Sequence, residues 1–495
     1  MAGQGFKYRD KLLATKKLIS TIFYHDKEII DLLMASFASR AHLCLLGARG
    51  GGKTHGCEAL LATIDDNIKA VAQGYLSAEM EELFARLNVA ELMRGREEVI
   101  TTELATARVK FFDEIQRLGP SAMCALFRLL TKGTIIYMGR EVGARPFWVL
   151  ATANPTEQAN DMLNVALPEP LWDRFEAVAW VPMPRLKYLM KINGREELMK
   201  ENMPKIWGEE ELLGLWAEVE AIKVPEGVDR IATIMVRICQ FCQYAEGYDG
   251  SSLTEAQKRE LCSRCNSSYI CSRIARPPSV RAKRALIRLA KGYAYLEGRH
   301  EVTLEDIKRA WPYVMRQRIT LMEEAEVADK AKALIKLAED ILNEVKEARE
   351  ALKLVEELKK EYDDGKMAAL ERWVASKVWL LEVKEELDSY FKELHDKLLL
   401  KWEEAKAKGD KATMLKIQAV ASKKLPPELR KDFEADIEVE VELSPQVLAK
   451  VAKTDRGLFK ALKAKMEAGE TVAKLRGRAA LIWLALNLPV KGGEN

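Results

Sequence analysis

The sequence lacks any long apolar run. Its longest uninterrupted apolar stretch, Ala479 to Leu486, falls well short of the roughly 20 residues that a helix needs to cross a bilayer. Residues 1–19 also lack the unbroken apolar core followed by small residues that marks a secretion signal. These two absences argue against a membrane-spanning or secreted protein, so we expect a cytoplasmic protein with no membrane partner.

An excess of charge of either sign is missing too. The chain has 78 Lys and Arg against 75 Asp and Glu, a net charge of +3, whereas nucleic-acid-binding domains usually show a clear basic excess. Cysteine is scarce, with eight in 495 residues, which argues against a disulfide framework and makes cysteine spacing the informative quantity. A chain of this length exceeds what one hydrophobic core serves, so we expect two or three domains.

Apolar periodicity predicts an α/β domain at the start of the chain. Short apolar runs at 42–46, 108–112 and 148–153 are typical of buried strands, and helical spacing covers 12–39, 58–68, 78–91 and 121–130. Strands that alternate with helices favour a parallel sheet. Residues 133–147 resemble a β-hairpin in pattern. We expect this domain to span 1–188.

Helical patterns dominate the rest of the chain and predict a helical domain at 189–322 and another at 323–495. Apolar residues follow heptad-like steps in 327–362, and a second amphipathic stretch covers 370–402, which indicates a coiled coil or long hairpin. A plain helical bundle is the alternative. Alternating residues at 437–443 predict one strand, followed by two more helices.

The residues that follow the first expected strand match a phosphate-binding loop. The spacing G-x-x-x-x-G-K-[ST] is present between an apolar strand and a helical pattern, which is the context that this motif needs. Backbone N–H groups of such a loop cradle phosphates, Lys53 reaches the β and γ phosphates, and Thr54 offers a hydroxyl to Mg²⁺. The predicted nucleotide-binding residues are Gly47, Ala48, Arg49, Gly50, Gly51, Gly52, Lys53, Thr54 and His55.

Two polar strand ends follow the loop along the chain. The run 109–112 ends in Asp113 and Glu114, and the run 150–153 ends in Asn154. Acidic strand ends and Asn-Pro turns are common by themselves, but their order after a phosphate-binding loop gives them roles. We expect Asp113 to bind Mg²⁺, Glu114 to activate water, and Asn154 to hold that water and a γ-phosphate oxygen. The chain is therefore predicted to hydrolyse nucleotide.

The stretch 151–175, ATANPTEQANDMLNVALPEPLWDRF, resembles MoxR-family AAA+ ATPases between their sensor-1 asparagine and their arginine finger. The resemblance implies an AAA+ core with an all-α lid, ATP as the substrate, and Arg174 as a finger that enters the neighbouring subunit's site. A surface salt bridge is the alternative for Arg174. Pro278-Ser-Val-Arg281 resembles the sensor-2 segment of the lid, and whether Arg281 serves its own or the neighbour's nucleotide stays open.

Residues 133–147 and a helical insertion around 82–98 correspond to the pre-sensor-1 hairpin and helix-2 insert of the clade that holds magnesium chelatase, minichromosome-maintenance helicases and MoxR. The resemblance implies a homo-hexameric ring, a von Willebrand A domain partner, and chaperone-like remodelling of a client protein complex, which we expect to meet the helices beyond residue 325. A nucleic-acid motor is the alternative. Five acidic residues in 81–98 argue against it, because a nucleic-acid contact needs basic side chains.

Cysteine spacing predicts a metal site in the helical lid. Cys239-x₂-Cys242 and Cys262-x₂-Cys265 are separated by 19 residues, a spacing typical of a structural four-thiolate Zn²⁺ site. Cys271 could replace one ligand. The alternative is buried free cysteines on amphipathic helices.

Overall fold

The structure is a computed structural model, and it describes residues 5–75, 78–143, 146–154, 167–192, 194, 196–240, 270, 273–322, 330–377, 379–433, 438–452, 456–476 and 483. The chain forms two compact units. The first holds Met1–Arg259 and Ser267–Val345, and the second holds Glu260–Asn266 and Lys346–Asn495. The domain boundaries proposed from the sequence, after residues 188 and 322, stay predictions.

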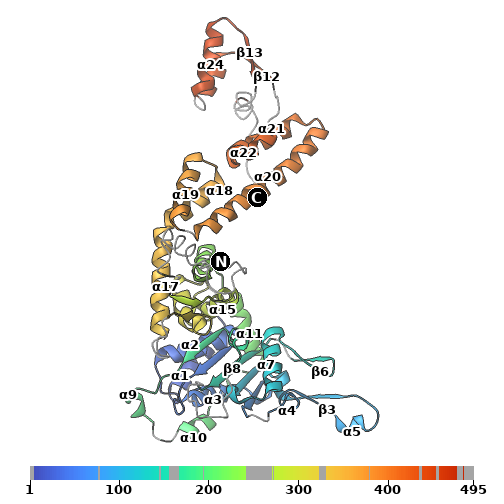
Figure 1. Ribbon diagram of the computed structural model, residues 1–495, viewed down its shortest axis with the longest axis vertical. Helices are drawn as coiled ribbons and strands as arrows, with labels where there is room; N and C mark the ends of the chain where they lie inside the picture. Colours follow the sequence, from blue (N-terminus) through green and yellow to red (C-terminus); the bar gives the residue numbers. More distant parts are fainter. Residues whose placement is uncertain are drawn as a thin grey trace, which may run out of the picture. The chain divides into compact units, whose positions relative to one another are not determined.

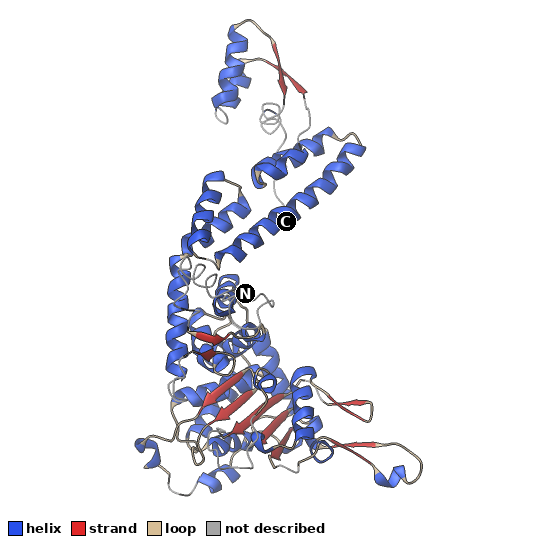
Figure 2. Cartoon of the chain, viewed as in Figure 1, coloured by secondary structure: helices blue, strands red, loops and turns tan. Residues whose placement is uncertain are grey.

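A five-stranded parallel sheet forms the centre of the first unit (Figures 1 and 2), in the order β2-β5-β8-β1-β9. All residues of β5 and β8 are buried, as expected for parallel strands that are covered on both faces. The predicted parallel α/β sheet is therefore confirmed. The strands are β1 (Leu43–Leu46), β2 (Lys69–Gln73), β5 (Val109–Asp113), β8 (Trp148–Ala153) and β9 (Ala177–Trp180).

The helices of the core are mostly where the periodicity places them, with different ends. The expected helix at 121–130 is α7 (Pro120–Lys132), which begins with a proline and ends at Gly133 with φ 76°, as such helices often do. The expected helix at 12–39 is divided into α1 (Arg9–Ser20) and α2 (Lys27–Ser39). The helix α3 (Lys53–Ala62) begins inside the glycine-rich loop and ends before residue 63.

The predicted helix at 78–91 and the helical insertion at 82–98 are wrong. This segment is a β-hairpin with short helices at its base and tip: α4 (Met80–Leu83), β3 (Ala85–Leu87), α5 (Val89–Leu92), β4 (Val99–Thr101) and α6 (Glu103–Thr106). The Thr102 hydroxyl donates to the carbonyls of Leu83 and Phe84 at 2.5 and 3.2 Å. This side chain closes the base of the hairpin, a contact that apolar periodicity does not reveal.

The hairpin predicted at 133–147 is confirmed as β6 (Ile135–Tyr137) and β7 (Arg140–Val142). It extends from the same end of the sheet as the hairpin β3–β4 (Figure 1). A guanidinium nitrogen of Arg140 donates to the carbonyl oxygen of Glu97 at 3.2 Å. The two hairpins are thus joined by a hydrogen bond.

A helical layer follows the sheet along the chain and completes the first unit. Its central helix α15 (Arg281–Leu296) packs directly on α2, where a Cβ at Gly292 would lie 2.2 Å from the carbonyl oxygen of Ala35. This backbone contact fixes the direction of α15 over the sheet. The other elements are α9 (Leu186–Leu189), α10 (Glu196–Glu201), α11 (Glu209–Glu220), α12 (Glu226–Gln240), β10 (Ile274–Arg276), α16 (Leu304–Met315), β11 (Thr320–Leu321) and α17 (Lys330–Glu347).

The second unit is helical, with one small sheet. The heptad-like run is divided at Ala348 into α17 and α18 (Arg349–Lys360), and α18 packs with α19 (Asp364–Ser376) and α20 (Leu380–Ala407). The helices α18, α19 and α20 thus pack as a plain helical bundle, the alternative to the predicted coiled coil or long hairpin. The expected strand is β12 (Glu438–Glu442), which pairs antiparallel with β13 (Val472–Arg476). The remaining helices are α21 (Lys411–Lys424), α22 (Pro427–Arg430), α23 (Pro445–Ala452) and α24 (Arg456–Glu467).

No helix in the described part of the chain is long and apolar enough to span a membrane.

Candidate active site

The glycine-rich loop lies between the carboxyl end of β1 and the first turn of α3. Gly50 and Gly52 have φ angles of 78° and 79°, a left-handed conformation that glycine adopts at little cost. A Cβ at Gly47 would lie 2.4 Å from the carbonyl oxygen of Val181. The loop therefore needs glycine at these positions, and the N-terminus of α3 follows it directly, an arrangement typical of anion sites.

The ammonium group of Lys53 is buried at the centre of the loop. Its Nζ donates to the carbonyl oxygens of Gly47 and Ala48 at 2.7 and 2.8 Å, and to Oδ1 of Asn154 at 3.0 Å. Burial lowers the pKa of Lys53, and the carboxylates of Asp113 and Glu114 oppose that shift. The predicted loop lysine and the predicted sensor asparagine are thus in direct contact.

Asp113 lies at the end of β5, beside Thr54. The Thr54 hydroxyl donates to Oδ1 of Asp113 at 2.8 Å, and the hydroxyl of Thr152 on β8 donates to the same oxygen at 2.5 Å. A hydroxyl and a carboxylate held side by side are the oxygen ligands that Mg²⁺ prefers. The residues predicted to hold Mg²⁺ are therefore adjacent and chemically suited to it.

Glu114 is held from three sides in an unusual backbone conformation. Its φ of 52° is left-handed, which costs a non-glycine residue on the order of 1 kcal/mol or more. Its N–H donates to Thr152 Oγ1 at 2.9 Å, its Oε1 accepts from Asn154 Nδ2 at 3.1 Å, and its Oε2 pairs with Arg117 at 2.8 Å. A Cβ at Gly74 would lie 2.1 Å from the Glu114 carbonyl oxygen. This conformation points the carboxylate toward Asn154.

Sequence reasoning missed three residues of this site. Thr152 was detectable as a hydroxyl in an otherwise apolar strand, and Arg117 as a cation three residues after Glu114. Gly74 had no signal, because its neighbour across the sheet is close only in the fold. His55 is predicted to belong to the nucleotide site, and its imidazole Nδ1 lies 3.4 Å from a carboxylate oxygen of Glu197; its role in nucleotide binding stays a prediction.

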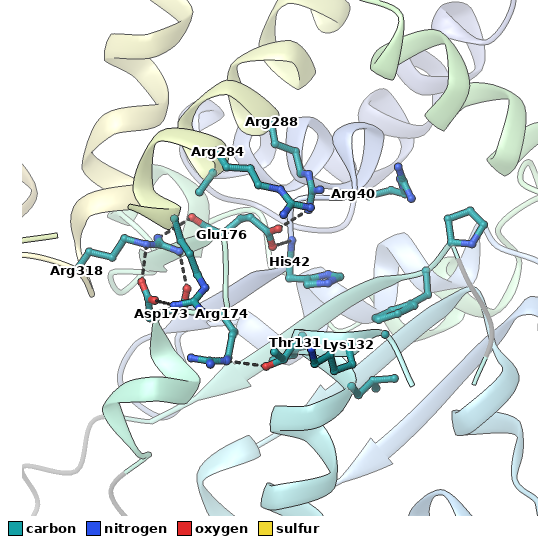
Figure 3. Close-up of a pocket in the computed structure, with 17 residues that line it drawn as sticks. Arg40, His42, Thr131, Lys132, Asp173, Arg174, Glu176, Arg284, Arg288 and Arg318 are labelled. Atoms are coloured by element: carbon teal, nitrogen blue, oxygen red, sulfur yellow. Dashed lines mark hydrogen bonds and ion pairs between the residues drawn. The ribbon is translucent and has the colours of Figure 1, made fainter. Parts of the chain in front are cut away.

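The second site is a cavity of 680 Å³ at the amino ends of β1, β8 and β9, opposite the end at which the glycine-rich loop lies. It is lined by residues that precede β1, β8 and β9, by the end of α7, and by α15 (Figure 3). Figure 3 shows Arg284 and Arg288 on one side of it and Arg174, Thr131 and Lys132 on the other. Its charged lining comprises seven cations and two carboxylates: Arg40, Lys132, Arg174, Arg281, Arg284, Arg288, Arg318, Asp173 and Glu176.

The two carboxylates of this cavity are already paired. Asp173 binds Arg281 at 2.9 Å and the buried Arg318 at 3.1 Å, and Glu176 binds Arg288. Burial lowers the pKa of His42 to about 4, so its imidazole is neutral at physiological pH. The cavity is therefore strongly positive.

Arg174, the predicted finger, lies in this cavity. Its guanidinium stacks 4.0 Å from the Phe127 ring centroid, and it donates to Thr131 Oγ1 at 2.7 Å and to the Pro170 carbonyl at 2.5 Å. Burial lowers the pKa of Arg174, and the nearby positive charge of Arg281 adds to that shift. Two cations predicted to act on phosphate are thus neighbours, at the opposite end of β1 and β9 from the glycine-rich loop of the same chain.

The predicted zinc site falls mostly outside the described residues, since Cys242, Cys262 and Cys265 are not among them. Cys239 is a buried thiol near the end of α12, and burial raises its pKa.

Comparison with known protein families adds to this geometry. Residues 42–175 match the AAA domain (dynein-related subfamily), and residues 274–344 match the AAA lid domain. The first match contains the glycine-rich loop and Arg174, and the second contains α15. The chain thus contains an AAA+ ATPase module, an AAA domain followed by its lid. The AAA+ fold, the lid and ATP hydrolysis that the resemblance implies are confirmed, and both matches are consistent with the MoxR resemblance.

Individual relatives of this AAA+ ATPase are distant. The uncharacterized protein YeaC of Bacillus subtilis is 23% identical over 313 residues, which cover 62% of this chain and 86% of YeaC. A crystal structure assigned as an ATPase of Cytophaga hutchinsonii is 22% identical, with a TM-score of 0.54, and the match covers 68% of this chain and 94% of that one. This likeness shows a shared fold.

A minichromosome-maintenance homolog from Methanopyrus kandleri is 16% identical, with a TM-score of 0.39, and the match covers 67% of this chain and 61% of that one. A likeness of this size carries no argument about function.

Proposed function

We propose that this AAA+ ATPase works as a ring of MoxR type, in which every active site is shared by two copies and ATP hydrolysis drives the remodelling of a protein complex. One observation carries the proposal. The phosphate-binding loop follows β1, whereas Arg174 precedes β9, and β1 and β9 pair in parallel from Leu43↔Ala177 to Leu46↔Trp180. The two sites are therefore separated by at least about 10 Å along the strands, given a rise of ~3.3 Å per residue.

Within one copy, the loop and strand ends hold and activate the substrate. The loop N–H groups and Lys53 bind the phosphates of ATP, and Thr54 and Asp113 would hold Mg²⁺, which neutralises phosphate charge when bound. Glu114 accepts a proton from the attacking water, and Asn154, which contacts both Glu114 and Lys53, positions that water against the γ-phosphate. The contacts among these side chains support their predicted roles.

The neighbouring copy supplies the cations at the far side of the γ-phosphate. An arginine that neutralises the charge of the transition state contributes about 10³ to 10⁵ in rate, and the position of Arg174 in a positively charged cavity supports this role. Arg281 lines the same cavity as Arg174 and is bound to Asp173, the residue that precedes Arg174 in the chain. This placement favours action of Arg281 on the neighbour's nucleotide, the question that the sequence left open.

A complementation experiment tests the shared site. Chains with Arg174→Ala keep an intact loop, and chains with Glu114→Gln keep an intact finger. Each variant alone should hydrolyse ATP at least ~100-fold more slowly than the native chain. Mixed assemblies, co-expressed with two tags and purified on both, should recover a measurable part of the native rate. Mixed assemblies as inactive as either variant would refute the proposal.

The two hairpins support a protein client over nucleic acid. Their tips expose apolar side chains, with Val89, Met93 and Met138 65%, 86% and 55% exposed. Four of the nearby arginines are engaged: Arg94 and Arg96 pair with Glu91, Arg128 pairs with Glu141, and Arg140 binds a carbonyl. Arg86 on β3 is exposed. ATP hydrolysis that DNA stimulates, with a steep loss on adding salt, would favour the alternative of a nucleic-acid motor.

The partner and the ring size rest on the MoxR resemblance, whereas the role of the helices beyond residue 325, which the resemblance does not cover, is a separate prediction. We propose a hexamer in the cytoplasm, a von Willebrand A domain partner, and client docking on the helices beyond residue 325. A chain lacking 325–495 should lose client and partner binding, and unchanged binding would contradict this assignment. The structural Zn²⁺ is tested by elemental analysis, where far less than one zinc per chain would remove it.

A further inference from the structure

Arg284 differs from the other cations that line the cavity at the amino ends of β1, β8 and β9. It lies on α15, one turn after Arg281, and lines the same cavity as Arg174. The side chain is exposed, and within the described part of the chain no hydrogen bond or ion pair involves its guanidinium group. No motif in the sequence singles it out.

The backbone of Arg284 is nonetheless held firmly. Three residues earlier, Arg281 is bound to Asp173, and four residues later, Arg288 is bound to Glu176. Farther along α15, Gly292 contacts the backbone of α2. The helix therefore fixes the backbone position of Arg284, which lowers the entropic cost of binding a ligand. The charged end of the side chain stays free to make that contact.

The charge balance of the cavity favours an anion at this place. Both carboxylates are occupied by the other arginines, so Lys132, Arg174 and Arg284 remain without an ion pair among the described residues. Cations that share a partly enclosed cavity repel one another. A group with several anionic oxygens removes that repulsion and accepts the paired N–H groups of a guanidinium.

We propose that Arg284 is a second arginine that contacts the phosphate groups of the ATP bound by the neighbouring copy, acting beside Arg174. This inference rests on the proposed function, because it needs a neighbour whose phosphates enter the cavity. A second cation of this kind contributes about 100- to 1,000-fold to the rate of hydrolysis. Arg284→Lys should keep part of that effect, since it retains the charge without the forked donor geometry.

The test measures ATP hydrolysis by full-length chains at saturating ATP and Mg²⁺. Arg284→Ala should lower kcat by about 100- to 1,000-fold, and the kcat of Arg284→Lys should lie between that of Arg284→Ala and the native value. The matched control is Lys283→Ala, which removes the adjacent cation of α15, one that is bound to Asp229 at 2.8 Å and does not line the cavity. It should hydrolyse at the native rate.

Mixed assemblies then decide whether Arg284 acts across the interface. Arg284→Ala chains co-purified with Glu114→Gln chains should recover activity, because intact loops then meet intact arginines. The same chains co-purified with a Glu114→Gln, Arg284→Ala double variant should not recover.

Three results would overturn the inference: a native rate for Arg284→Ala, a loss that the mixed assembly does not rescue, or equal rescue by the double variant. Failure of the shared site itself is seen separately, since Arg174→Ala mixed with Glu114→Gln would then show no rescue.

Discussion

Thr152 offers a sharp test of how the hydrolytic site is built. Its hydroxyl donates to the Asp113 carboxylate at 2.5 Å and accepts the N–H of Glu114 at 2.9 Å, and the residue is 1% exposed. Thr152→Val keeps the shape and removes both hydrogen bonds. The first is a bond to a charged group, worth about 1.5 to 3 kcal/mol, and the second leaves a buried N–H unpaired at a cost of about 1 to 3 kcal/mol.

We expect the free energy of unfolding of Thr152→Val to fall by about 3 kcal/mol, because the added methyl group recovers part of the loss. We also expect kcat to fall by about 100-fold, because Glu114 loses the bond that holds its left-handed backbone and a small displacement of a catalytic group is costly. Urea unfolding and steady-state ATP hydrolysis measure the two effects.

Thr63→Val is the matched control. Thr63 is also fully buried, but its hydroxyl only donates to the Leu60 carbonyl at 2.7 Å within its own helix turn. It should lose about 1 kcal/mol and keep its kcat. If Thr152→Val were no less stable and no less active than Thr63→Val, Thr152 would have no part in positioning Asp113 and Glu114.

Three further predictions concern other parts of the chain. Glu114→Gln should still bind ATP, measured by fluorescent-nucleotide displacement, but hydrolyse it at least ~100-fold more slowly; native turnover would refute its role. Gly292→Ala should lower the free energy of unfolding by about 3 kcal/mol, because its Cβ would lie 2.2 Å from a carbonyl oxygen of α2; an unchanged urea midpoint would contradict this packing. Burial lowers the pKa of His395, but hydrogen bonds to Asp396 and Asp432 outweigh that effect and raise it. Because the pKa is raised in the folded state, the protonated imidazole of His395 stabilises the fold below about pH 6.5. This stabilisation is lost as the pH rises through the folded-state pKa. Hydrogen exchange in 385–433, corrected for intrinsic rates, should therefore be faster at high pH in the native chain, and His395→Gln should remove the difference.

The sequence predicted the elements whose chemistry is local. A continuous apolar run such as that of β8 predicts a buried strand, and β8 is buried along its whole length. The phosphate-binding loop from Gly47 to Thr54 could be predicted from the spacing of its glycines and from its position between a strand and a helix. Asp113, Glu114 and Asn154 were predictable because each ends such a strand.

The features that the sequence did not predict depend on contacts between distant segments. The segment around Phe84 has helical periodicity, but the Thr102 hydroxyl closes it into a hairpin. Gly74 is required only because Glu114 lies against it. Arg284 becomes notable only when α15 is placed over the edge of the sheet, since nothing in the surrounding residues distinguishes it from Lys283.

We infer that one copy of the chain cannot hydrolyse ATP efficiently, because its loop and its Arg174 lie at opposite ends of the paired strands β1 and β9. The most direct measurement is ATP hydrolysis per chain in fractions resolved by size, with the mass of each fraction determined at the assay concentration. We predict that hydrolysis is confined to assemblies of two or more copies and that monomers retain less than about 1% of that rate, given the contribution of an arginine finger. Monomers that hydrolyse ATP at the rate of the assemblies would contradict the account.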